Sequence, residues 1–286
     1  MASPSRTKRK PDVLTPAVDP APILQEIAEV SKRLPSCDGI DPTPVLQEIA
    51  ELTKKLPTSD GVPLESSWHL ASISLLIQSL TYLWRDREDF FVGGNNFIYY
   101  SVRQRYDEDV RGPDFYYVSG VERRRPRECW VVWLEGKYPD LIVEFLSPST
   151  AAIDRGPKKT LYEQTFQTPE YFCYEPRTWQ LDGWRLHGRR YKKIRPDKRG
   201  WLWSETLQLW LGSWQGTFHD VNATWLRCYD AQGQLVLLES EAEHQRAEVE
   251  RQRAEAERQR AEAAEAELAR LKAALAKKGI PPDSAR

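Results

Sequence analysis

The stretch PDLIVEFLS at residues 139–147 is a run of β-favouring apolar residues with one carboxylate, Glu144, in its middle. Side chains alternate in direction along a strand, so the stretch has two faces. An apolar strand of this kind is expected to be covered on both faces, where an unpaired carboxylate is costly. Glu144 therefore needs a salt bridge, a shared proton or a metal ion, and the stretch alone favours a paired structural glutamate. One face would carry Asp140, Ile142, Glu144 and Leu146, and the other Leu141, Val143 and Phe145.

The composition of the whole chain excludes several classes of protein. Its 286 residues have room for one large domain with appendages or for two small domains. The formal net charge of −1 gives no global attraction to nucleic acid or to a membrane. No apolar run approaches the roughly 18 residues that span a bilayer, and the basic opening MASPSRTKRKPD lacks the apolar segment of a secretory signal. We therefore expect a cytoplasmic protein with no membrane partner.

The four cysteines lie far apart in the sequence and include no CxxC pair. A zinc site or a dense disulfide framework would need patterned spacing. Buried free thiols in a reducing compartment are therefore expected. The cysteines are Cys37, Cys129, Cys173 and Cys228.

The first 63 residues are predicted to hold a disordered arm and an internal repeat. Residues 1–21 are rich in Pro, Ser and Lys/Arg, which predicts disorder. PILQEIAEVSKRLPSCDGID (22–41) then matches PVLQEIAELTKKLPTSDGVP (44–63) at a period of 22 residues. Each copy has apolar residues at helical spacing and ends in a Pro and an Asp-Gly turn. Because two copies are too few for a solenoid, residues 22–63 are interpreted as duplicated short helix–turn units that pack on the core or bind a partner.

Residues 64–238 are the expected globular domain, because all 11 tryptophans fall within them. An apolar stripe predicts a helix over residues 68–84, with Ser66 or Ser67 as its cap. His69 lies on the inward side of this stripe. A core histidine is favoured there over a site residue.

The rest of this domain is predicted to be mostly strands and turns. A strand entered through Gly-Pro carries Asp114 at its mouth, and four arginines between 123 and 127 follow in a loop. Pro is well placed in the first turn of a helix, so a helix is predicted to begin at Pro157. The other expected elements are a hairpin at 90–101, a continuation of the sheet at 130–134, the rest of the helix to 167, a strand at 171–174 and hairpins over 180–211.

A basic cluster lies within the predicted hairpins. Eight Lys and Arg residues fall between residues 185 and 199, interleaved with His187 and Tyr191. This cluster is either a solvated hairpin or a surface that follows a phosphate backbone, in which case DNA is the partner. Its members are Arg185, Arg189, Arg190, Lys192, Lys193, Arg195, Lys198 and Arg199.

Residues 239–279 change abruptly to a composition rich in Glu, Arg, Gln and Ala, with the heptads AEVERQR (247–253) and AEAERQR (254–260). The pattern predicts one long charged helix, supported by Glu–Arg pairs along its surface. Leucines near its end fit a coiled-coil seam, although Ala and Glu occupy most earlier seam positions. The helix is therefore either solvated and single or a weak coiled coil that makes a homo-oligomer. Residues 280–286 are expected to be a disordered end.

Three chemically active groups are expected to gather around residues 139–147. They are Asp114 on the preceding strand, Glu144 on the strand itself and Lys158 on the following helix. Phosphodiester hydrolysis uses such a set: two carboxylates hold Mg²⁺ or Mn²⁺, and the ion activates a water and offsets transition-state charge. A nearby lysine orients or deprotonates the water, or stabilises the developing charge.

The surrounding motifs, over about residues 60–235, carry a resemblance to a known family. They are Gly112-Pro113-Asp114, the block PDLIVEFLSPST at 139–150, Asp154, Lys158 and Tyr162 in steps of four, Pro169-Glu170-Tyr171-Phe172, and Glu175-Pro176. In these residues the chain resembles the Uma-two (Uma2) family of restriction endonucleases, within the PD-(D/E)XK nuclease superfamily.

This resemblance implies an α/β fold: a restriction-endonuclease-like core with a mixed β-sheet flanked by helices, here with an N-terminal helical repeat and a long C-terminal charged helix added. It implies that Asp114 and Glu144 are catalytic metal ligands. The superfamily's lysine usually lies two residues after the second acid, where this chain has Leu146. In this family the lysine looks displaced to the next helix, at Lys158, with Lys159 as the alternative.

Three other motif positions receive smaller roles from the same reasoning. Asp140 opens the strand, and a structural role is favoured there over a part in the site. Asp154 looks like a turn or capping residue. Glu175 stands where the family usually has Asp, which is a conservative change.

Two functions follow. The first is a Mg²⁺-dependent endonuclease that hydrolyses DNA with Asp114, Glu144 and Lys158. The second is a catalytically inactive nuclease-fold protein that binds nucleic acid or assembles through the C-terminal helix. The first requires the three side chains to converge in an open cleft within reach of one ion, because ligand distances are about 2–2.5 Å.

Overall fold

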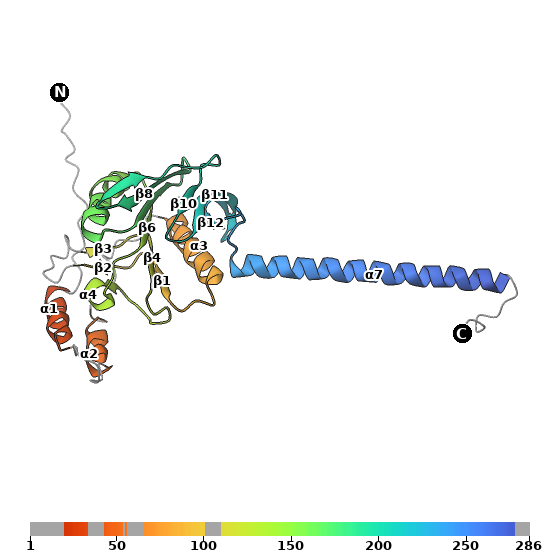
Figure 1. Ribbon diagram of the computed structural model, residues 1–286, viewed down its shortest axis with the longest axis horizontal. Coiled ribbons are helices and arrows are strands. Elements are labelled where there is room, and N and C mark those ends of the chain that lie inside the picture. The colour runs from red at the N-terminus through yellow and green to blue at the C-terminus, as the bar shows by residue number, and fades with distance from the viewer. Residues whose placement is uncertain (1–19, 34–42, 54, 56–65, 101–109, 278–286) are drawn as a thin grey trace, which may run out of the picture. The chain divides into compact units, whose positions relative to one another are not determined.

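A computed structural model of the chain describes residues 20–33, 43–53, 55, 66–100 and 110–277. The chain divides into two compact units, Met1–Val236 and Leu237–Arg286. The first unit contains the sheets and the helices that pack on them, and the second contains one long helix (Figure 1). The arm expected at 1–21 lies outside the described residues except for its last two, which begin the first helix. The end expected at 280–286 also lies outside them.

The largest sheet has six strands in the order β1-β4-β6-β7-β8-β9. Strands β6 and β7 pair in parallel, and the other pairings in this sheet are antiparallel. The mixed sheet expected for the core is therefore confirmed, and the strands expected at 139–147 and 171–174 are its two parallel central strands. The strands are β1 (Phe90–Gly93), β4 (Phe115–Ser119), β6 (Leu141–Phe145), β7 (Glu170–Glu175), β8 (Gln180–His187) and β9 (Arg190–Lys193).

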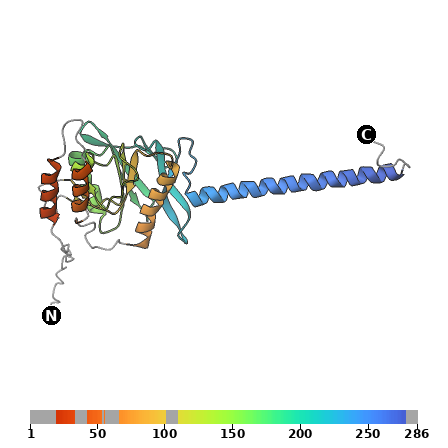
Figure 2. The same ribbon diagram turned by 90° about the horizontal axis from the view of Figure 1, so that it is seen from below.

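The two faces of β6 enter different cores, as side-chain alternation predicted. Leu141, Val143 and Phe145 pack with helix α3 (Ser67–Leu83) and with a second, antiparallel sheet. This sheet consists of β10 (Leu202–Ser204), β11 (Leu209–Phe218) and β12 (Val221–Tyr229). Helix α3 contacts both β4 and β12, so it lies between the two sheets (Figures 1 and 2). Its predicted cap is confirmed, because the Ser66 side chain accepts the His69 N–H at 3.2 Å.

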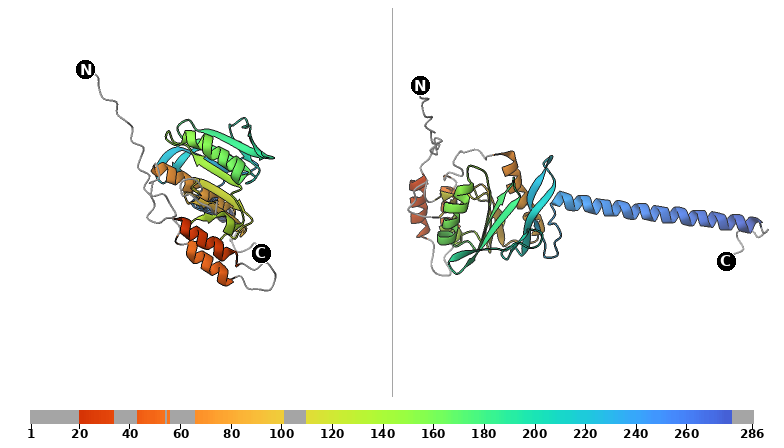
Figure 3. Two further views of the ribbon diagram at one scale, coloured as in Figure 1. Left: turned by 90° about the vertical axis from the view of Figure 1, so that its left-hand side faces the viewer. Right: turned by 90° about the horizontal axis from the view of Figure 1, so that it is seen from above.

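A helical segment between β6 and β7 covers the other face of the six-stranded sheet (Figure 3). It was expected to begin at Pro157 but begins at Ala151. Two π-helical turns interrupt it, and Pro157 lies inside the first. A proline offers no N–H and crowds the preceding turn, and a wider π turn lets the segment continue through it. The parts are α5 (Ala151–Ile153), η1 (Asp154–Lys158), α6 (Lys159–Leu161) and η2 (Tyr162–Phe166).

The prediction of a hairpin at 90–101 is wrong. Strand β1 pairs with β4, whereas β2 (Ile98–Tyr99) belongs to a third sheet with β3 (Val110–Arg111) and β5 (Trp130–Val131). A Cβ atom at Gly94 would collide with the Asp114 carbonyl oxygen and with the Ile73 side chain. The glycine therefore serves a close approach of the backbone to β4 and α3 rather than a hairpin turn.

The expectation for residues 130–134 is also wrong in part. Only Trp130–Val131 is a strand, and it joins the third sheet rather than the main one. The chain then turns into helix α4 (Val132–Glu135), which ends at Gly136 in a left-handed conformation with φ 70°. A glycine adopts this conformation without strain, so it marks the helix end.

Helices α1 (Pro20–Ser31) and α2 (Thr43–Thr53) lie side by side, at the positions of the two matching stretches (Figures 1 and 3). Leu24, Ile27 and Ile49 are buried in a cluster that also contains Tyr99 and Val131 of the third sheet. The helices therefore pack on the core, which was one of the two roles expected for them. The turns that complete each unit lie outside the described residues.

The second unit contains α7 (Glu239–Lys277), which confirms the long charged helix. Arg251 pairs with Glu248, and Arg258 pairs with Glu255 and Glu262, at spacings of three and four residues. These pairs support a helix within one chain. The coiled coil stays a prediction. No helix in the described ranges combines the length and apolar character that a membrane crossing needs.

Candidate active site

Glu144 lies in the middle of β6, between β4 and β7, and its side chain is 0% exposed. It is on the face that the helical segment covers, where Ile142 and Leu146 are also buried. The groups that stabilise this buried carboxylate must therefore come from the residues that surround it.

Asp114 is brought to Glu144 by the register of β4 and β6. Phe115 lies opposite Val143, so the residue before Phe115 comes beside Glu144. The Asp114 N–H donates to Glu144 Oε2 at 3.3 Å, and the Phe145 N–H donates to Asp114 Oδ2 at 2.7 Å. Each carboxylate thus accepts a backbone N–H from the opposite segment, which fixes the two acids together.

Lys158 reaches the same carboxylate from η1. Its Nζ lies 3.1 Å from Glu144 Oε1, and the Tyr162 hydroxyl donates to that oxygen at 3.0 Å. Lys158 and Tyr162 are four residues apart, and in a regular α-helix of 3.6 residues per turn they would point in slightly different directions. The wider π turns bring the two side chains closer to the same direction. Of the three residues predicted for the site, Glu144 is therefore contacted by both others, by the Asp114 backbone N–H and by Lys158 Nζ.

Lys159, the alternative lysine, is directed elsewhere. Its Nζ lies 5.0 Å from the ring centroid of Trp184 and 5.8 Å from that of Tyr191. These are cation–π distances. Lys158 is therefore the lysine that meets the acids.

Sequence reasoning missed two members of the cluster. His69, for which a core role was favoured, is buried, but its Nε2 lies 2.9 Å from Asp114 Oδ1. Asp154, expected in a turn or as a cap, is a helical residue with 2% exposure whose Oδ1 lies 2.9 Å from Lys158 Nζ. The inward position of His69 and the four-residue step from Asp154 to Lys158 were the available signals.

Asp140 lies on the same face of the strand but contacts a different set of residues. Its Oδ2 accepts the Ser119 N–H at 2.7 Å and lies 2.8 Å from Lys137 Nζ. These contacts hold the beginning of β6 against the end of β4. Asp140 therefore has the contacts of a structural residue, as the sequence favoured.

The electrostatics of the cluster are dominated by burial. Burial raises the pKa of Glu144, the Lys158 ammonium lowers it, and the charges of Asp114 and Asp154 raise it again, to about 8. Burial alone would lower the pKa of Lys158, but Glu144, Asp154 and Asp114 outweigh it and raise that pKa above its ordinary value. Burial and then the charge of Glu144 hold the pKa of Tyr162 well above its usual range. The cluster therefore has more negative charge than Lys158 balances.

Asp114 and Glu144 are the side chains of this cluster that could hold a divalent cation. Among the described residues, no group of three or more His, Cys, Asp and Glu side chains is arranged to hold a metal ion by itself. Mg²⁺, however, is usually bound by only one or two protein carboxylates and keeps several waters. Asp114 and Glu144 are two carboxylates, which provide the hard oxygen ligands that Mg²⁺ takes.

The basic cluster at 185–199 divides into two halves. Half of its members are ion-paired within the domain: Arg185 with Glu170 and Glu205, Arg190 with Glu163, Lys193 with Asp182 and Arg199 with Asp197. The other members are exposed and have no ion pair in the part of the chain that the structure describes. These unpaired residues are Arg189, Lys192, Arg195 and Lys198.

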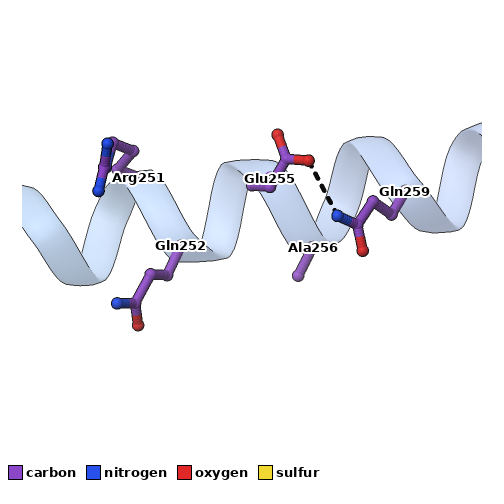
Figure 4. Close-up of a pocket in the computed structure, with 5 residues that line it drawn as sticks. All are labelled: Arg251, Gln252, Glu255, Ala256 and Gln259. Atoms are coloured by element: carbon purple, nitrogen blue, oxygen red, sulfur yellow. Dashed lines mark hydrogen bonds between the residues drawn. The ribbon is translucent and has the colours of Figure 1, made fainter.

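A shallow depression lies on α7, and none of the site residues described above lines it (Figure 4). Its lining residues are all exposed, and Gln259 donates to Glu255 at 2.9 Å across it. It is an open helix surface and has no buried polar group, so we assign no site there. Its other lining residues are Arg251, Gln252 and Ala256.

The fold is a mixed sheet flanked by helices, as expected, and both Asp114 and Lys158 contact Glu144 on its central strand β6. Residues 48–215, more than half of the 286-residue chain, match the family model "Uma2: Putative restriction endonuclease". The chain belongs to this family.

Solved structures include a similar chain titled "Crystal structure of a putative nuclease belonging to DUF820 from Anabaena variabilis ATCC 29413". It is 13% identical in sequence, with a TM-score of 0.39, and the match covers 55% of this chain and 89% of that one. No curated protein matches the chain.

Proposed function

We propose that this protein is a metal-dependent endonuclease that hydrolyses phosphodiester bonds of DNA, with Mg²⁺ or Mn²⁺ as its cofactor. The observation that carries this proposal is that Asp114, just before β4, and Lys158, in the helical segment, both contact Glu144 of β6. Family membership supports the same reaction class.

Asp114 and Glu144 would hold the ion. When bound, the ion supplies Lewis-acid activation of water and offsets negative charge on the phosphate. The Tyr162 hydroxyl and the Asp114 N–H fix the two oxygens of Glu144, so the carboxylate needs no reorientation. Because the pKa of Lys158 is raised, its ammonium stays charged and stabilises the developing negative charge instead of taking a proton from water.

The direct test is cleavage of supercoiled plasmid DNA. The purified protein should nick it with Mg²⁺ or Mn²⁺ and stop when a chelator is added. Glu144→Gln keeps the shape of the side chain but removes its charge, so the nicking rate should fall by on the order of 10²-fold or more. Lys159→Ala is the matched control, and it should cleave at the wild-type rate because Lys159 contacts aromatic rings rather than the acids.

A second candidate function is binding of nucleic acid without cleavage. The exposed, unpaired Arg189, Lys192, Arg195 and Lys198 favour it, because such residues are free to contact phosphates. The closed contacts around Glu144, with 0% exposure, favour it as well. Retained DNA binding with no cleavage under either metal would reject the endonuclease and leave this function.

A further inference from the structure

Asp154 is a buried carboxylate one helical turn before Lys158. It has 2% exposure, and its Oδ1 lies 2.9 Å from Lys158 Nζ. A buried charge is tolerated when it is paired. The burial of Asp154 therefore depends on the Lys158 ammonium.

The same ammonium is held from a second side. Lys158 Nζ lies 3.1 Å from Glu144 Oε1 and 2.9 Å from Asp154 Oδ1, so it is placed between two carboxylates. A lysine side chain has a flexible stem and carries considerable rotamer entropy. One ion pair leaves the stem several ways to reach its partner, whereas two pairs from different elements restrict it to the directions that satisfy both.

The backbone of Asp154 is fixed independently of Lys158. Its carbonyl oxygen accepts the Tyr171 hydroxyl at 2.9 Å, and its N–H donates to the Thr150 carbonyl at 3.0 Å. The next residue, Arg155, pairs with Asp182 of β8 at 3.3 Å. Asp154 is thus tied to the sheet through β7 and β8, and it offers Lys158 a rigid partner.

We propose that Asp154 is a positioning residue, which holds the Lys158 ammonium against Glu144 so that it faces the phosphate. The effect on cleavage rests on the proposed function. The contact between Asp154 and Lys158 does not, and it can be tested separately.

The first experiment is a double-mutant cycle of urea unfolding in chelator, with Asp154→Asn, Lys158→Met and the combined variant. Asp154→Asn should lower the unfolding midpoint in the wild-type background. In the Lys158→Met background it should leave the midpoint unchanged or raise it, because the carboxylate there is already unpaired. Asp140→Asn is the matched control, since this carboxylate at the start of β6 pairs with Lys137 and the Ser119 N–H rather than with Lys158, and should shift the midpoint equally in both backgrounds.

The second experiment is a cycle of plasmid-nicking kinetics on the same variants. Asp154→Asn should lower kcat by on the order of 10²-fold, the size expected for misplacing a catalytic group, with DNA affinity unchanged. It should lower kcat no further when Lys158→Met is present. Asp154→Glu keeps the charge and should recover part of the rate, so it replaces the Asn variant if that variant does not fold.

The outcomes separate the two proposals. Additive unfolding effects would overturn the contact whether or not the protein cleaves DNA. Coupled unfolding with kcat retained in Asp154→Asn would overturn the positioning role and leave a structural pair. A wild-type protein that never cleaves would refute the proposed function, and the unfolding cycle would still decide whether Asp154 holds Lys158.

Discussion

Glu144 is a buried carboxylate that requires stabilising contacts from its neighbours. A carboxylate with 0% exposure is tolerated because Lys158, Tyr162 and the Asp114 N–H all contact it. These contacts do not fully offset burial and the neighbouring acids, since its pKa is raised to about 8. Ionisation of Glu144 in the free protein is therefore unfavourable, and a bound cation would relieve that cost.

The raised pKa of Glu144 predicts a pH dependence of stability in metal-free protein. Between its ordinary pKa of 4.5 and its folded pKa of about 8, the folded state binds a proton that the unfolded state has lost. The free energy of unfolding should therefore fall as pH rises through this window and level off above it. Urea unfolding from pH 5 to 9 in chelator measures this fall.

Glu144→Gln is the control for that measurement, because it cannot titrate. Its free energy of unfolding should lack the part of the fall that Glu144 contributes. Added Mg²⁺ should raise the unfolding midpoint of the wild-type protein at pH 8 and not that of the variant. Identical pH profiles for the two proteins would contradict the assignment of the raised pKa.

At the scale of elements, the end of α3 depends on a residue distant in sequence. Arg123 comes from the loop of arginines, and its guanidinium donates to the carbonyl oxygens of Trp84, Arg85 and Arg87 at 2.9 Å each and of Thr81 at 3.2 Å. Thr81 is in the last turn of α3, where carbonyls have no partner within the helix, and the other three residues follow the helix end at Leu83. A cation at this end also favours the helix dipole. The sequence indicated only that these arginines lie in a loop.

Arg123→Ala is expected to lower the free energy of unfolding by about 2 kcal/mol, because it leaves several carbonyl groups without their charged donor. Urea unfolding measures the change. Arg124→Ala is the matched control: Arg124 makes an exposed pair with Glu88, and its loss should change stability by no more than about 0.5 kcal/mol. Equal effects of the two substitutions would show that Arg123 is not the cap of α3.

At the scale of the whole molecule, positive and negative charges nearly balance, but only some of the basic side chains are ion-paired. The formal net charge is −1, and half of the basic cluster is neutralised within the domain by Glu and Asp partners. The other half carries charge that no acidic side chain in the described part of the chain offsets. On α7, Leu268 and Leu271 are 52% and 54% exposed, so these two positions of the predicted coiled-coil seam face solvent in the single chain.

The unpaired half of the cluster predicts how DNA affinity depends on salt. Lys192→Gln combined with Lys198→Gln should weaken binding equally for different DNA sequences. It should also reduce the slope of log affinity against log salt by about 1 for each phosphate that the protein no longer neutralises. Lys193→Gln is the control, since Lys193 already pairs with Asp182, and it should change the slope less. Binding titrations at several salt concentrations decide, and an unchanged slope in the double variant would exclude these residues from the interface.

The sequence alone determined what depends on neighbouring residues and on family motifs. Alternation along 139–147 predicted which residues of β6 share a face, the apolar stripe predicted α3, and the motifs named Asp114, Glu144 and Lys158. Tertiary structure decided what depends on contacts between distant segments. It paired β1 with β4 and let the helical segment continue through Pro157. It also placed His69 against Asp114, Asp154 against Lys158, and Lys159 against aromatic rings. Periodicity fixes the direction of a side chain relative to its own element, whereas only packing fixes what it meets.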